Sequence, residues 1–151
     1  MALTVGDKAP EVLGFNENGE EVRLDTYKGR KLVLYFYPKD NTPGCTSEAC
    51  NLRDNYEALR AEGYEVVGVS PDSAASHQRF KAKYELPFTL VSDGDHTLLE
   101  AFGAWGEKTM CGRKYMGVLR STFLIDENGV ITKAFGPKEV KVKEHAAQIL
   151  K

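Results

Sequence analysis

The sequence predicts an α/β fold in which a central sheet of mixed direction is flanked by helices and extended by an N-terminal β-hairpin. Three observations lead to this prediction. Apolar runs typical of buried strands alternate with helical segments through the middle of the chain. Towards each end of the chain, two strand-like segments flank a turn that contains Asn-Gly. The chain closes with a segment whose apolar residues recur at helical spacing.

The individual elements follow in order along the chain. The N-terminal hairpin pairs residues 11–15 with residues 20–24 across the turn at 16–19. Residues 32–37 are apolar at consecutive positions, which is typical of a strand covered on both faces, and Pro38 ends it. The remaining predicted elements are helix 43–61, strand 66–69, helix 73–84, strand 88–91, helix 97–102, the hairpin strands 118–126 and 130–135, and helix 138–150.

This order of elements is that of a thioredoxin-like core, and it occupies the chain as a single domain, residues 1–151. The formal net charge of −2 gives no electrostatic basis for binding nucleic acid or an anionic membrane. No apolar run resembles a signal peptide, and no segment has the roughly 18 apolar residues of a membrane-spanning helix. We therefore expect a cytoplasmic protein.

The strongest indication of a reactive residue in the sequence lies at the start of helix 43–61. Thr42 is a favoured N-cap residue and Pro43 a favoured first helical residue, so Cys45 falls in the first turn. Free backbone N–H groups and the positive end of the helix dipole stabilise an anion there. Because this position favours the thiolate, which is the nucleophilic form of cysteine, Cys45 is predicted to be reactive.

The same helix places Cys50 on a different face. Cys45 begins a core-facing stripe at spacings of four and three, continued by Ala49, Leu52, Tyr56 and Leu59. Cys50 belongs to a polar line, with Thr46, Arg53, Glu57 and Arg60. On an intact helix the Cα atoms of the two cysteines would lie about 8–9 Å apart, whereas a disulfide requires less than about 7 Å. A disulfide between them therefore requires the first turns of the helix to unwind.

Other interpretations of these cysteines have less support. Both could be small buried residues without reactivity, as free cysteines often are. A thioredoxin-type dithiol site requires Cys-x-x-Cys, but Glu48 stands at the fourth position. A cysteine phosphatase would require an arginine six residues after the nucleophile, where Asn51 stands. A metal site is not indicated, because His77, His96 and His145 lie on separate elements and are expected to be surface or capping residues.

The sequence resembles the peroxiredoxins, in particular the group named after bacterioferritin comigratory protein or PrxQ. Pro38, Thr42 and Cys45 match the Pro-x-x-x-Thr-x-x-Cys motif of that family. Arg120, at the start of Arg-Ser-Thr-Phe-Leu-Ile-Asp, matches the strand arginine of the family. Cys50 matches the position of the resolving cysteine in the group, and the resemblance extends over nearly the whole chain.

The resemblance implies a thiol-specific peroxidase that reduces hydrogen peroxide and organic hydroperoxides in antioxidant defence, without a metal or other cofactor. Cys45 would attack the peroxide and become a sulfenic acid, with Thr42 orienting the peroxide and Pro38 excluding water. Arg120 would stabilise the thiolate and the charge on the departing oxygen. Cys50 would then form an intramolecular disulfide with Cys45, which thioredoxin or a similar dithiol donor would reduce. A monomer, or in some members a dimer, is also implied.

Three alternatives stay open. Arg120 alternates with Val118 and Thr122 on one predicted strand face and could equally be an ordinary salt-bridge partner. Cys111 lies in a polar, glycine-containing loop before that strand, and is either an incidental thiol or a second resolving cysteine. The domain could also be a redox-sensing or partner-binding module in which oxidation switches an interaction.

Overall fold

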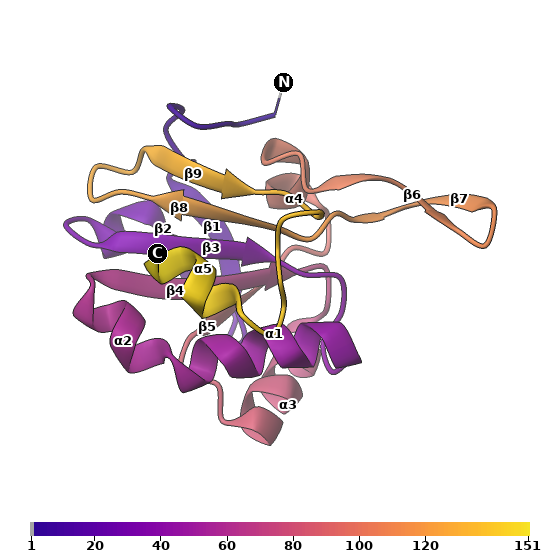
Figure 1. Ribbon diagram of the computed structural model, residues 1–151, viewed down its shortest axis with the longest axis horizontal. Helices are drawn as coiled ribbons and strands as arrows, with labels where there is room; N and C mark the ends of the chain where they lie inside the picture. Colours follow the sequence, from indigo (N-terminus) through magenta and orange to yellow (C-terminus); the bar gives the residue numbers. More distant parts are fainter. Residues whose placement is uncertain (1) are drawn as a thin grey trace.

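The computed structural model describes residues 2–151, which form a seven-stranded sheet, a separate two-stranded sheet and flanking helices (Figure 1). The strands are β1 (Val12–Asn16), β2 (Glu21–Arg23), β3 (Lys31–Phe36), β4 (Tyr64–Ser70), β5 (Thr89–Ser92), β6 (Trp105–Met110), β7 (Arg113–Val118), β8 (Ser121–Ile125) and β9 (Ile131–Phe135). The helices are the 3-10 helix η1 (Leu24–Tyr27), α1 (Pro43–Asp54), α2 (Tyr56–Ala61), α3 (Ala74–Tyr84), α4 (Thr97–Ala101) and α5 (His145–Leu150).

The main sheet has the strand order β2-β1-β5-β4-β3-β8-β9. β3 and β4 pair in parallel, as do β4 and β5, which is the arrangement expected of βαβ units. β8 runs antiparallel to β3, β9 runs antiparallel to β8, and β1 joins the N-terminal hairpin to β5. The predicted α/β fold, with a mixed sheet and an N-terminal hairpin extension, is confirmed.

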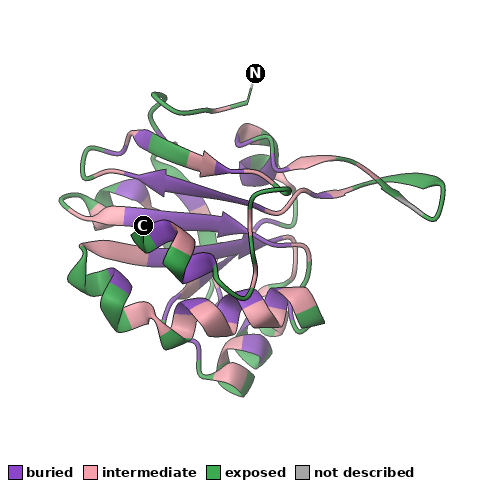
Figure 2. Cartoon of the chain, in the orientation of Figure 1, coloured by how far each residue is buried: buried purple, intermediate pink, exposed green. Residues whose placement is uncertain are grey.

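The central strand β3 shows why an unbroken apolar run was needed. It lies between β4 and β8, and helices cover both of its faces. Leu32, Leu34 and Phe36 pack in the core on the α4 side of the sheet. Val33 and Tyr35 point the other way, into the core formed with α1, α2, α3 and α5. β3 and β8 are buried almost throughout, whereas the helices are exposed on their outer sides (Figure 2).

The predicted helix 43–61 is divided at Asn55 into α1 and α2. Asn55 has φ −112° and ψ 14°, and its side-chain amide donates to the carbonyl of Asn51 at 2.8 Å. A short polar side chain that bonds to the backbone in this way competes with the backbone hydrogen bonds of the helix. The predicted core-facing stripe still holds across the break, because Leu52 in α1 and Leu59 in α2 are both completely buried.

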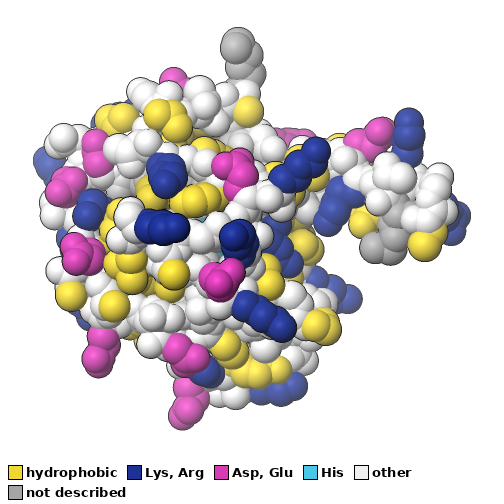
Figure 3. Space-filling model, viewed as in Figure 1, with side chains coloured by type: hydrophobic (Ala, Val, Ile, Leu, Met, Phe, Trp, Pro, Cys, Tyr) yellow, Lys and Arg dark blue, Asp and Glu magenta, His cyan; other side chains and the backbone are white. Residues whose placement is uncertain are grey.

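An arm formed by β6 and β7 replaces the loop that was expected around Cys111. The two strands pair along their length, and Cys111 and Gly112 form the turn with φ values of 52° and 79°. Two left-handed residues in a two-residue turn match the twist of a hairpin. The arm stands clear of the main body (Figure 3) and exposes Tyr115 and Met116. Because much of the arm is exposed, it lacks the apolar alternation by which strands are predicted.

Two other boundaries differ from the prediction. The predicted strand 118–126 is interrupted, since β7 ends before Arg120 and β8 begins after it; Arg120 therefore lies in a connection rather than on a strand face. The predicted helix 138–150 is reduced to α5. The residues before α5 are not helical. The side chain of Gln148 stabilises their conformation, because it accepts from the N–H of Lys141 and donates to the carbonyl of Glu139.

Candidate active site

The first turn of α1 carries Cys45 on the side that faces the core. Thr42 has the extended backbone of an N-cap residue, with φ −101° and ψ 155°, and Pro43 opens the helix as predicted. The Thr42 hydroxyl donates to the carbonyl of Lys39 at 2.9 Å, so it does not cap a helix N–H group as expected. Cys45 has 2% of its surface exposed. Its sulfur therefore meets the positive end of α1 in a largely water-free setting.

Arg120 brings a positive charge directly to this sulfur. Its Nη2 donates to Cys45 Sγ at 3.2 Å, and its Nη1 donates to Glu48 Oε1 at 2.5 Å. The guanidinium therefore bridges two groups that lie one turn apart on the same side of α1. Gly44 leaves room for this approach, because a Cβ atom at that position would lie 3.3 Å from Nη2 and would displace the guanidinium slightly. Arg120 is thus both a salt-bridge partner and a contact of Cys45.

Glu48 also belongs to the site, although it was not predicted from the sequence. It is completely buried. Burial raises the pKa of its carboxyl to about 7, and the charge and hydrogen bond of Arg120 oppose that rise. The available signal was an acidic residue three positions after Cys45, on the core-facing side of an amphipathic helix. Such residues are almost never fully buried unless they are paired, so a basic partner could have been predicted.

His145, which is bonded to Thr122, lies beside the second carboxyl oxygen of Glu48. His145 Nε2 lies 4.0 Å from Glu48 Oε2 and 2.7 Å from the Thr122 hydroxyl, while its Nδ1 lies 2.9 Å from Gln148 Oε1. Burial lowers the pKa of His145, which keeps the ring neutral. Nδ1–H then donates to Gln148, and Nε2 accepts from Thr122. Glu48 Oε2 has no hydrogen-bond partner among the described residues. The negative charge of this carboxylate is therefore balanced by Arg120.

The loop between β3 and α1 is anchored by a buried network around Asp40. His77 Nδ1 lies 2.7 Å from Asp40 Oδ2, and the hydroxyls of Tyr37 and Ser76 donate to the same carboxylate at 2.6 and 2.8 Å. Pro38 follows β3 at the start of this loop and is half-buried. The network ties the loop that leads into α1 to residues of α3.

Two of the three histidines are placed differently from the prediction. His77 and His145 are completely buried, so their assignment as surface or capping residues is wrong. His96 occupies the N-cap position of α4 and stacks on Trp105, with ring centroids 3.8 Å apart. Buried imidazoles need specific partners on distant elements, which their spacing in the sequence does not reveal.

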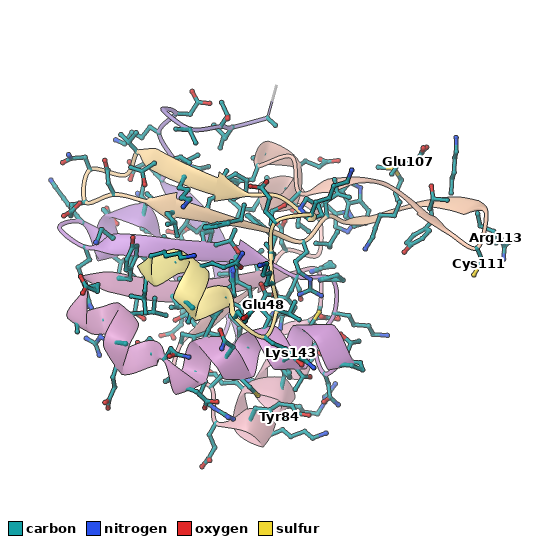
Figure 4. The ribbon with its side chains drawn as sticks, in the orientation of Figure 1. Glu48, Tyr84, Glu107, Cys111, Arg113 and Lys143 are labelled. Atoms are coloured by element: carbon teal, nitrogen blue, oxygen red, sulfur yellow. The ribbon has the colours of Figure 1, made fainter. Side chains whose placement is uncertain are left out.

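The other two cysteines lie apart from Cys45, and all three are free thiols. Cys50 is half-buried on α1, which is continuous from Pro43 to Asp54. Cys111 is exposed at the tip of the arm, well away from Glu48 in Figure 4. Because this helix is intact, a disulfide between Cys45 and Cys50 would require its first turns to unwind, as expected from the spacing of the two residues.

Glu48→Gln is expected to change how stability depends on pH. The Glu48 carboxyl has a folded-state pKa of about 7 against an ordinary value of 4.5, because burial disfavours its charged form. Between these values the folded protein holds a proton that the unfolded chain has lost. The free energy of unfolding contributed by this group therefore falls as pH rises from 4.5 to 7, by on the order of 3 kcal/mol.

Urea unfolding at a series of pH values measures this effect. The glutamine variant cannot titrate at this position and should lose that part of the slope. Glu107→Gln, on the exposed arm, is the matched control and should keep the slope of the parent. A Glu48→Gln protein with an unchanged slope would show that the carboxyl is not the source.

Two further properties concern the whole of residues 2–151. They include no cluster of three or more His, Cys, Asp or Glu side chains arranged to hold a metal ion. None of the helices in this range has both the length and the apolar character needed to cross a bilayer.

Arg120 contacts the sulfur of Cys45 directly, and Glu48 in turn contacts Arg120.

The chain matches the model of the AhpC/TSA family over residues 5–134. It is 49% identical over 150 residues to peroxiredoxin Bcp of Bacillus subtilis, covering 99% of this chain and 94% of the relative. It is 51% identical over 150 residues to a putative peroxiredoxin bcp of Coxiella burnetii, covering 99% and 98%. With peroxiredoxin Bcp of Escherichia coli K12 the identity is 43% over 148 residues, covering 98% and 94%.

Solved structures show the same relationship. A PrxQ mutant from Xylella fastidiosa superposes with a TM-score of 0.89 at 37% identity, covering 99% of this chain and 94% of that one. The bacterioferritin comigratory protein of Xanthomonas campestris, for which an alkyl peroxide reduction activity is described, has a TM-score of 0.84 at 38% identity, covering 95% of each chain. The fold is therefore the thioredoxin-like fold that was predicted. The chain belongs to the AhpC/TSA family and, within it, is similar to the Bcp and PrxQ peroxiredoxins.

Proposed function

We propose that this protein is a thiol peroxidase whose peroxide-reactive residue is Cys45. The observation that carries the proposal is the 3.2 Å contact between Arg120 Nη2 and Cys45 Sγ at the start of α1. A guanidinium beside a buried sulfur stabilises the thiolate, and the thiolate is the form that attacks. Membership of the AhpC/TSA family and the alkyl peroxide reduction activity described for the Xanthomonas campestris relative support the same chemistry.

In the first step the Cys45 thiolate attacks one oxygen of a hydroperoxide. An S–O bond forms, the O–O bond breaks, and the sulfur is oxidised to a sulfenic acid. The other oxygen leaves as an alkoxide or hydroxide and takes a proton from solvent to become an alcohol or water. Arg120 stabilises the negative charge as it moves from sulfur to the departing oxygen. Thr42 orients the peroxide and Pro38 excludes water; their positions in the loop before α1 support these roles.

In the second step Cys50 resolves the sulfenic acid. Its sulfur attacks the Cys45 sulfur, an S–S bond forms, and the sulfenic oxygen leaves as water. Thioredoxin or a similar dithiol donor then reduces the disulfide and is itself oxidised to a disulfide. Both reacting cysteines lie on one helix, so the cycle can be completed by a monomer. The need for a reducing dithiol donor favours the cytoplasm as the site of action.

A coupled assay tests the proposal. The protein is mixed with thioredoxin, thioredoxin reductase and NADPH, and hydrogen peroxide or a small alkyl hydroperoxide is added. NADPH oxidation is expected to continue for many equivalents of peroxide per protein chain. Oxidation that stops after one equivalent would contradict the proposal and would identify a redox-sensing module.

Cys50→Ser is expected to separate the two steps. The sulfenic acid should form on Cys45 at the rate of the parent and be captured by a dimedone-type reagent. Thioredoxin-coupled turnover should fall at least about tenfold, because the intramolecular thiol that reacts at high effective concentration is lost.

Mass mapping of the peroxide-treated parent completes this test. A bridge between Cys45 and Cys50 is expected as the main product. A main product that joins Cys45 to Cys111 would instead assign the resolving role to Cys111. Cys111→Ser is the matched control, and its turnover should equal that of the parent.

A further inference from the structure

We propose that the side chain of Asn51 is a latch that ties α1 to α5 and limits how fast the helix unwinds for Cys50 to reach Cys45. The inference rests on the proposed function, because this unwinding matters to the chemistry only if the two cysteines join. It is carried by the contacts of Asn51, by its place in the chain, and by the other attachments of α1.

Both polar atoms of the Asn51 amide bond to the C-terminal segment. Its Nδ2 donates to the carbonyl of Lys143 at 3.0 Å, and its Oδ1 accepts from the backbone N–H of Ala146 at 2.8 Å. Ala146 lies in the first turn of α5, where backbone N–H groups have no partner within the helix. One side chain of α1 therefore both caps α5 and joins the two helices.

The position of Asn51 couples this latch to the resolving step. Asn51 follows Cys50 directly in the chain. Bringing the sulfur of Cys50 to Cys45 requires the segment that joins them to leave the helical conformation, because an intact helix holds the Cα atoms about 8–9 Å apart. When the unwound segment includes the backbone of Cys50, the next residue is displaced and both hydrogen bonds of Asn51 break.

The end of α1 is held on its opposite side as well. Arg53 Nη1 donates to the carbonyl of Tyr84, at the end of α3, at 2.8 Å. In Figure 4, Lys143 lies on the α5 side of α1 and Tyr84 lies on its α3 side. Opening of the segment between Cys45 and Cys50 therefore works against an anchored helix end, and Asn51 is the anchor nearest to Cys50.

Oxidation weakens one other attachment of this segment, the contact of Arg120 with Cys45, but leaves the latch unchanged. Arg120 holds Cys45 and Glu48 in the reduced protein. When the thiolate becomes a neutral sulfenic acid, the attraction between Arg120 and the sulfur is reduced. Asn51 is neutral and contacts neutral backbone groups, so its bonds have the same strength before and after oxidation. The latch acts on the resolving step and not on the attack on peroxide.

Slow unwinding has a chemical consequence. Before Cys50 has reacted with the sulfenic acid, a second hydroperoxide can transfer one oxygen to it, which gives a sulfinic acid and an alcohol or water. The latch therefore sets the balance between disulfide formation and overoxidation of Cys45.

Asn51→Ala tests this inference through two independent measurements. In the reduced protein, hydrogen exchange of the amides between Cys45 and Cys50 should become about tenfold faster, the order expected on losing two neutral hydrogen bonds. In the oxidised protein, disulfide formation should speed up by a similar factor, while sulfenic acid formation stays at the rate of the parent. The peroxide concentration that overoxidises half of the protein should rise accordingly.

Two variants sharpen the test. Asn55→Ala removes an amide from the same helix end without removing a contact to α5, so its exchange and resolution should match the parent. Asn51→Asp keeps the acceptor for the N–H of Ala146 but sets a carboxylate oxygen against the carbonyl of Lys143 in place of a donor, so its exchange and resolution should also be faster than in the parent.

The outcomes distinguish this inference from the proposed function. Exchange and resolution in Asn51→Ala that equal those of Asn55→Ala would overturn the inference. So would an equal change in the rate of sulfenic acid formation, because Asn51 would then act only by supporting the fold. Faster exchange in Asn51→Ala, in a protein that consumes no peroxide, would support the latch and contradict the peroxidase proposal.

Discussion

Replacing Cys45 by serine is expected to lower the second-order rate constant for peroxide reduction by at least about a thousandfold. A serine hydroxyl at this position has nearly the same shape but is not ionised at neutral pH, so it cannot attack the O–O bond. The ion pair between Arg120 and Glu48 does not involve the sulfur and should keep the fold intact. Peroxide consumption followed colorimetrically, with thioredoxin present, measures the loss.

Cys111→Ser is the control for Cys45→Ser, because it removes a thiol that is exposed on the arm. It should reduce peroxide as fast as the parent. Peroxide reduction at the full rate by Cys45→Ser would show that another group reacts, and would refute the assignment of Cys45.

Arg120→Gln should have the second largest effect, acting on both rate and stability. Loss of the guanidinium beside the sulfur should slow sulfenic acid formation about 10²–10³-fold, as for other preorganised charges that stabilise a transition state. Glu48 would then be buried without a counter-charge, which should cost on the order of 3 kcal/mol of stability above about pH 8, where the carboxyl of the parent is ionised. Because Arg120 opposes the effect of burial, the pKa of Glu48 should also rise further above its present value of about 7.

The double variant Arg120→Gln with Glu48→Gln separates these two effects. Neutralising both partners removes the uncompensated charge, so most of the stability lost in the single variant should return. The rate of sulfenic acid formation should stay low, because no positive charge faces Cys45. Stopped-flow oxidation and urea unfolding measure the two quantities. A double variant that regains the rate along with the stability would show that Arg120 serves only the fold.

Local patterns made much of the fold predictable. The consecutive apolar residues of β3 and the Thr42-Pro43 start of α1 both act within a few residues of chain, and both appear in the structure close to where they were expected. The arm at 105–118 and the residues 138–144 before α5 were not predicted correctly. The arm is exposed and lacks an apolar pattern, and the second segment is held by Gln148 through bonds that override helical periodicity.

The sequence by itself determined that Cys45 lies in the first turn of a helix, on its core-facing side, and that Cys50 lies on another face, because capping and helical periodicity are local effects. Only the tertiary structure decided which groups surround these cysteines. Arg120 reaches the sulfur across 75 positions of sequence, and the carbonyl of Lys143 meets Asn51 across 92. Such contacts depend on how the sheet pairs β3 with β8 and on where the C-terminal segment packs against α1. No periodicity in the chain encodes those distances, so the environment of Cys45 was determined by packing.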